Sequence, residues 1–184
     1  YVWNGRVVDE PLSMLTLVLE PGGVAGTVLY SRGSYHVRLI GDGLSAVQAQ
    51  APQRRDDIVK IPPQRRRSPG RSRATPDSRG PAEWDVLALF TKQAAKDNGG
   101  RGATKADWKV AIANWNTSLR NSGIDAVVRL IKMRKWNNKR RGTDGDFADE
   151  LLVDLTEDKK VARLRKKFGA DIVSAAIEIN DVTC

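Results

Sequence analysis

Residues 84–90 read WDVLALF, a near-continuous apolar run that is typical of a strand buried on both faces of a sheet. Two more apolar stretches follow, IDAVVRLI at residues 124–131 and DIVSAAIEI at residues 171–179. Segments with helical spacing separate the three stretches. Because strand–helix–strand crossovers are right-handed and join parallel strands, this order predicts a mostly parallel sheet. We therefore expect an α/β fold for residues 83–184, running strand, helix, strand, helices, strand.

Apolar residues three and four positions apart mark the helical segments. The clearest begins near Thr104, a candidate N-cap, and ends at the turn Asn121-Ser122-Gly123. A tryptophan stripe of this kind is more often core than ligand platform. Shorter helices are predicted at residues 91–96, 146–155 and 161–168, and the polar, basic residues 136–145 predict a surface loop. The apolar positions of the long helix are Trp108, Ala111, Ile112, Trp115 and Leu119.

Residues 1–50 have a different pattern, in which short apolar runs alternate with glycine turns such as Pro21-Gly22-Gly23. Leu15, Leu17 and Leu19 share one face with a period of two, as expected of a strand. The pattern predicts a small antiparallel β leader module. Because a meander of about 50 residues is marginally stable alone, we expect it to pack against a neighbour. The predicted strands cover residues 1–8, 14–20, 24–30, 35–40 and 44–48.

A basic, proline-rich linker at residues 51–82 separates the two halves. Its six prolines remove amide donors and fix φ, so neither a helix nor a central strand is expected there. Arg65, Arg66 and Arg67 form a basic triplet that a trypsin-like or furin-like protease would cut, and they are a candidate processing site. The alternative, a solvated linker that its charges keep extended, stays open.

The net charge of +9 raises the question of nucleic-acid binding. Residues 1–49 carry a net charge of −1 (3 basic, 4 acidic), residues 50–83 carry +5 (9 basic, 4 acidic) and residues 84–184 carry +5 (19 basic, 14 acidic). The charge is densest at residues 64–73, QRRRSPGRSR, which offer no aromatic rings for base stacking and no rigid element to present the arginines. This argues against a nucleic-acid partner. The apolar runs are too short to span a bilayer, so no membrane partner is expected either.

One histidine and one cysteine limit the catalytic and metal sites that the chain can form. His36 has no second histidine to share a metal and lies far in sequence from the second half, so it is expected to be a surface or edge-strand histidine. The glycine cluster at residues 99–102 lacks the spacing of a Rossmann or P-loop nucleotide site. Asn116-Thr117-Ser118 fits a glycosylation sequon, but it falls on a predicted helix.

Several stretches resemble reprolysin-like (adamalysin-type) zinc metallopeptidases of the metzincin group. WDVLALFT at residues 84–91 resembles the opening strand, and VARLRKKFGADIVSAAI at residues 161–177 resembles the helix that leads into the third strand. Trp115-Asn116 and the turn into Ile124 resemble the end of the first long helix, and residues 3–47 are similar to the β-rich propeptide of secreted members. The resemblance implies a secreted zinc endopeptidase whose metal-activated water hydrolyses protein or peptide substrates.

The chain departs from this family at the metal site. The family binds zinc through H-E-x-x-H-x-x-G-x-x-H, and no such motif occurs here. The resemblance therefore implies zinc in the full-length protein with ligands after Cys184, and no catalytic or metal-binding residue within the chain, which would be inactive as given. Cys184 is expected to be half of a disulfide with a downstream partner, or a free buried thiol.

Two other functions remain open at this point. One is a non-catalytic binding or inhibitory module that kept the scaffold without the metal helix. The other is a basic nucleic-acid-associated protein, which would bind in a salt-sensitive manner. The coding sequence beyond Cys184 separates the first alternative from the peptidase.

Overall fold

The structure is a computed structural model that describes residues 1–50, 80–138 and 146–177. Residues 1–50 form an antiparallel sheet, called the β-module below, whose five strands lie side by side in chain order. This confirms the predicted leader meander, although the first strand is shorter than expected. The strands are β1 (Val2–Gly5), β2 (Met14–Glu20), β3 (Gly23–Tyr30), β4 (Gly33–Gly41) and β5 (Leu44–Gln50).

A second, parallel sheet forms from the three apolar stretches of the second half. Strand β6 (Ala82–Phe90) lies between β7 (Ala126–Lys135) and β8 (Ile172–Ala176) and pairs in parallel with both. The side chains at residues 86–90 are all between 0 and 5% exposed, as expected of a strand covered on both faces. The α/β fold class is therefore confirmed. The last positions predicted for the third strand, residues 178–179, lie outside the described residues.

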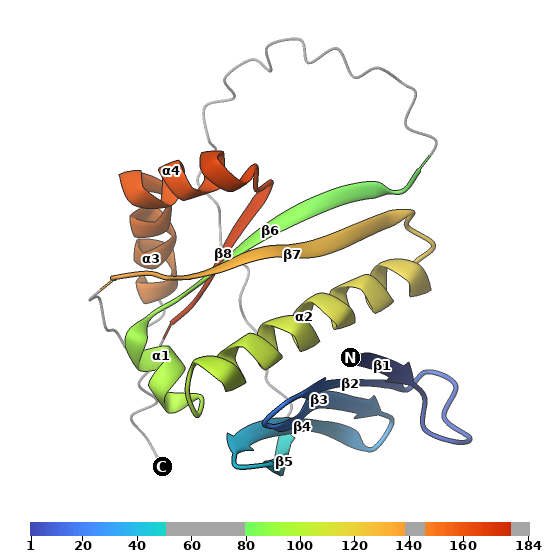
Figure 1. Ribbon diagram of the computed structural model, residues 1–184. Helices are drawn as coiled ribbons and strands as arrows, with labels where there is room; N and C mark the ends of the chain where they lie inside the picture. Colours follow the sequence, from blue (N-terminus) through green and yellow to red (C-terminus); the bar gives the residue numbers. More distant parts are fainter. Residues whose placement is uncertain (51–79, 139–145, 178–184) are drawn as a thin grey trace.

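Four helices complete the described fold. Helix α2 (Arg101–Asn121) covers one face of the parallel sheet, and α3 (Asp146–Glu157) and α4 (Lys159–Phe168) cover the other (Figure 1). The short helix α1 (Lys92–Asp97) joins β6 to α2. The β-module packs on the opposite side of α2, so this helix lies between the two sheets (Figure 1).

Local signals set most of the helix ends. Thr91 caps α1 by accepting a hydrogen bond from the Ala94 amide at 3.1 Å, and Asp158 caps α4 through the Lys160 amide at 2.7 Å. Gly123, after α2, and Gly169, after α4, both have a φ of 67°, which glycine adopts without strain. No helix within the described residues is long and apolar enough to cross a membrane.

Two sequence predictions are wrong in detail. Helix α2 begins at Arg101 with Gly100 as its N-cap, so Thr104 lies inside the first turn, where its hydroxyl donates to the Gly100 carbonyl at 2.9 Å. Trp136, predicted in a surface loop, is only 5% exposed, and its indole N–H donates to Asp158 Oδ2 at 2.9 Å. Trp136 packs with the α3–α4 side of the sheet, a partner that its own polar neighbours do not reveal.

Candidate functional site: the docking face of helix α2

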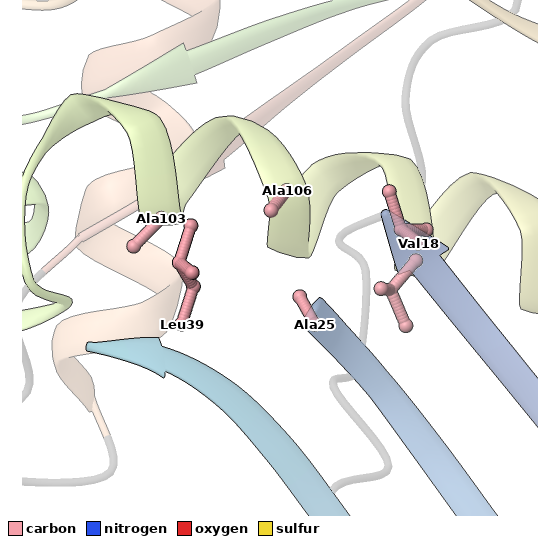
Figure 2. Packing of buried hydrophobic residues seen from close by; sticks show 6 residues of the cluster. Val18, Ala25, Leu39, Ala103 and Ala106 are labelled. Atoms are coloured by element: carbon pink, nitrogen blue, oxygen red, sulfur yellow. The ribbon is translucent and has the colours of Figure 1, made fainter. Parts of the chain in front are cut away.

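Helix α2 has two packing faces. Leu119 and Ile112 pack with the parallel sheet. On the other side, three small residues of the helix meet three residues of the β-module, and these six are called the docking cluster (Figure 2). A helix that is apolar on two sides is expected when it lies between two sheets. The docking cluster consists of Val18, Ala25, Leu39, Ala103, Ala106 and Val110.

Small side chains let the helix lie close to the β-module. Ala25 and Ala106 are both 0% exposed and offer only a methyl group to the contact. The turn before α2 also approaches closely, because a Cβ placed on Gly99 would lie 3.2 Å from the Leu39 carbonyl oxygen. Gly99 has a φ of +83°, so the backbone there favours glycine. Within the glycine cluster at residues 99–102, Gly99 and Gly100 thus form the turn into α2.

Polar pairs surround the docking cluster. The Lys109 ammonium forms an ion pair with Glu20, and the Asn114 amide donates to Thr27 Oγ1 at 2.9 Å. At the other end, Arg38 Nη2 donates to the Asp97 carbonyl oxygen at 3.2 Å. A small apolar centre with a polar rim is the anatomy of contacts between separable units, rather than that of a continuous core.

His36 belongs to this rim. Its Nε2 lies 3.6 Å from Asp107 Oδ1, while the Asn98 amide donates to Asp107 Oδ2 at 2.6 Å. Asp107 Oδ1 is buried and has no hydrogen-bond partner among the described residues. The prediction of a surface or edge-strand histidine is wrong, because β4 lies between β3 and β5 and α2 covers this face, leaving the His36 side chain 23% exposed.

A cavity of about 510 Å³ lies at one end of the docking face, beside the carboxyl end of β8 and the helix that follows β6. The crevice outside the carboxyl ends of parallel strands is where open α/β sheets bind ligands. Arg38, Asp97 and Trp108 line the cavity, so it offers a guanidinium group, a carboxylate and an indole. The Thr104 hydroxyl, also in the lining, is occupied by the Gly100 carbonyl. The described lining is therefore suited to binding and contains no nucleophile beside a base.

The tryptophans of α2 differ from the sequence prediction. Trp115 is 38% exposed and its ring lies 6.4 Å from that of Trp84, while Trp108 lines the cavity. The prediction that this stripe is core is therefore wrong for Trp115, while Trp108 is half-buried. The fully buried positions of α2 are instead small or aliphatic, such as Ala106 and Val110, because the β-module approaches the helix closely there.

Asn116 has a structural role that the sequence did not predict. Its amide nitrogen donates to the Val128 carbonyl oxygen at 2.9 Å, and the Val128 amide donates to Asn116 Oδ1 at 2.7 Å. The side chain thus pairs with β7 as a neighbouring peptide group would. A glycan on the same nitrogen would compete with this pairing, which argues against the sequon interpretation. The only feature of the sequence that could have indicated this pairing is a polar residue at a helical position that lies half-buried.

The remaining predicted sites are not brought together by the structure. Arg65, Arg66 and Arg67 lie outside the described residues. Within the described ranges, no group of three or more His, Cys, Asp or Glu side chains is placed to hold a metal ion. Because the whole sequence holds one histidine, these residues do not fit a three-histidine zinc centre.

No protein-family model matches the chain, and no curated protein matches it. Among solved structures, the chain is similar to part of one described as the structure of a chaperone-substrate complex, with 14% identity and a TM-score of 0.48. The similarity covers 92% of this chain and 24% of the other, so this chain spans about a quarter of that chain's length.

Proposed function

We propose that the chain comprises the pro-module and the first part of the catalytic domain of a secreted zinc endopeptidase. In this proposal the β-module is the removable leader, and residues 51–82 carry a processing site at Arg65, Arg66 and Arg67. Residues 83–184 begin the catalytic domain. The partners are then protein or peptide substrates and a processing protease that cuts the linker.

The observation that carries the proposal is how the β-module meets the rest of the chain. Its sheet is separate from the parallel sheet, so the described strands of the two halves share no pairing, and the halves meet mainly through side chains on α2. The ion pair of Lys109 with Glu20 and the Asn114–Thr27 hydrogen bond lie in this contact. A leader that holds its partner before processing and leaves afterwards needs a specific but separable contact of this type.

The outer edge of β8 gives independent support. Among the described residues, β8 pairs with β6 on one side and with no strand on the other. Because sheet edges are normally covered, capped or paired, this edge is where a further strand would add. In the family that the sequence resembles, the edge strand and the zinc-binding helix come later in the chain. The zinc ion, held by residues beyond Cys184, would supply the activated water for hydrolysis.

The test is to determine the coding sequence beyond Cys184 and to express the complete product. We expect an H-E-x-x-H helix and zinc-dependent hydrolysis of an unfolded protein substrate, lost on chelation and restored by zinc. A variant with the motif glutamate changed to glutamine should bind zinc and stay folded but hydrolyse nothing, which separates metal chemistry from a contaminating protease. A stop codon soon after Cys184, or a continuation with no metal motif, would refute the peptidase and favour the non-catalytic module.

A further inference from the structure

The β-module turns one whole face away from α2. Because side chains alternate along a strand and Val18 and Ala25 contact α2, the residues next to them in sequence face outward. Strand pairing extends this assignment across the five strands, except at the end of β4, where the register shifts next to Leu39 and Leu39 packs against α2. The outward residues, called the outer face, include Trp3, Leu15, Leu17, Leu19, Val24, Val28, Tyr30, Tyr35, Val37 and Val47.

The outer face carries no charged side chain within the described strands, although 29% of the residues in the chain are charged. The charged strand residues Glu20 and Arg38 lie on the other face, where they contact the α1–α2 region. In a sheet with one face in water, apolar and polar residues normally alternate along each strand, so that the face in water is polar. Large exposed apolar patches mark interaction sites. Trp3, Leu19 and Val47 are nevertheless 51, 47 and 68% exposed.

We propose that the outer face is a self-association surface, and that its occupant is the outer face of a second copy of this chain. The two β-modules would stack as the sheets of a β-sandwich do, about 10 Å apart. This inference is independent of the peptidase proposal, because it rests only on the β-module.

Large side chains cover part of the backbone on the outer face. A Cβ placed on Gly26 would meet the Leu17 side chain, and one placed on Gly5 would meet the Trp3 ring. Large neighbours therefore cover two of the three outward glycines, whereas Gly33, which pairs with Tyr30, has open space around it. An uncharged, apolar surface is complementary to another of the same kind, which a two-fold pair supplies directly.

Area and charge are both compatible with a pair. Five strands about 4.8 Å apart, each of about seven residues at about 3.4 Å, give a footprint of about 570 Å² per copy. Two copies together cover about 1,100 Å², close to the roughly 1,200 Å² at which specific interfaces begin. Residues 1–49 carry a net charge of only −1, so the β-modules themselves add little repulsion, while the positive charge that gives the whole chain its +9 lies in residues 50–184. The stacked rings of Tyr30 and Tyr35, 6.0 Å apart, add aromatic contact area.

The test is sedimentation velocity and light scattering of the full chain over a concentration series on the order of 1 to 100 µM, the affinity range expected for so small an interface. We expect a species of twice the monomer mass that dissociates on dilution. The double variant Leu19→Lys/Val47→Lys should raise the dissociation constant at least about tenfold, because it places charges in the stacked faces. Leu12→Lys and Val8→Lys are the controls, since these residues are 97 and 83% exposed and lie outside the outer face.

Circular dichroism and thermal unfolding confirm that each variant is folded. A wild-type chain that stays monomeric over the whole series would overturn the proposal and would mean that another part of this chain, or a different protein, covers the outer face. A dimer that the double variant leaves unchanged would overturn it as well. Equal weakening by the control variants would also count against it, because the outer face would then have no special role.

Discussion

Replacing Val18 with alanine tests the docking of the β-module on α2. Val18 lies on the face of β2 that α2 covers and is 0% exposed. Removing two methyl-sized groups costs about 1.6 kcal/mol at about 0.8 kcal/mol each. The cavity left between the sheet and the helix adds to this loss, so we expect the free energy of unfolding to fall by about 2 to 2.5 kcal/mol.

The matched control is Val2→Ala, on the same face of the neighbouring strand and paired with Val18 in register, but 50% exposed. We expect it to cost less than about 1 kcal/mol, the range of strand propensity alone. Urea unfolding followed by tryptophan fluorescence gives both values, and amide hydrogen exchange in β2 and β3 locates the loss. If Val18→Ala costs no more than Val2→Ala, α2 does not bury this position in solution and the docking argument fails.

Three further predictions follow from named contacts. Asn116→Ala should lower the free energy of unfolding by about 1 to 3 kcal/mol, because it leaves the Val128 amide and carbonyl groups without this partner. The control is Asn121→Ala, at an exposed position of the same helix, which should be nearly neutral. Urea unfolding measures both values. Gly99→Ala should destabilise the fold, because φ is +83° at this position and the new Cβ would press on the Leu39 carbonyl. Gly102→Ala, in the first turn of α2 with open space around it, should stabilise the fold by up to about 1 kcal/mol. Equal effects of the two variants on the melting temperature would contradict this. The hydrogen bond from the Trp136 indole holds the pKa of Asp158 below its ordinary value of 3.8, so the stability that this carboxylate contributes is complete above that value and is lost as the pH falls below it. Trp136→Phe should therefore make acid unfolding less steep, and Trp115→Phe should leave the slope unchanged; two identical pH profiles of the melting temperature would show that the indole contact does not set the pKa.

Much of the fold follows from local sequence. The glycine turns and apolar alternation at residues 1–50 predict the meander, and the run at residues 84–90 predicts a strand covered on both faces. The arrangement of α2 between two sheets could not be predicted, because the tryptophans dominate its pattern. The residues that contact the β-module are alanines and one valine, whose spacing is a weak signal when read alone. Ala103, Ala106 and Val110 nevertheless recur at helical spacing, which was the signal available.

The site could be predicted less well than the fold. His36 and Trp136 depend on partners distant in sequence, Asp107 and Asp158, and local polarity gave the wrong environment for both. Asn116 forms hydrogen bonds with backbone groups of β7, a strand that follows α2 in the chain, so no local sequence motif predicts these bonds. The arginine triplet at residues 65–67 lies outside the described residues and stays a prediction.

The central claim is that a separable β-module is held on α2. The most direct test is to cleave the linker and measure the mass of the complex that the two pieces form. In a variant whose other paired basic sites outside the described helices and strands, Arg54-Arg55 and Lys139-Arg140-Arg141, are changed to alanine, brief treatment with a protease specific for paired basic residues should cut at Arg65, Arg66 or Arg67. Native mass spectrometry should then show the two pieces as one non-covalent complex. The complex should dissociate more readily for Val18→Ala than for Val2→Ala. Pieces that separate at once in the wild type, or a linker that resists the protease, would contradict the account.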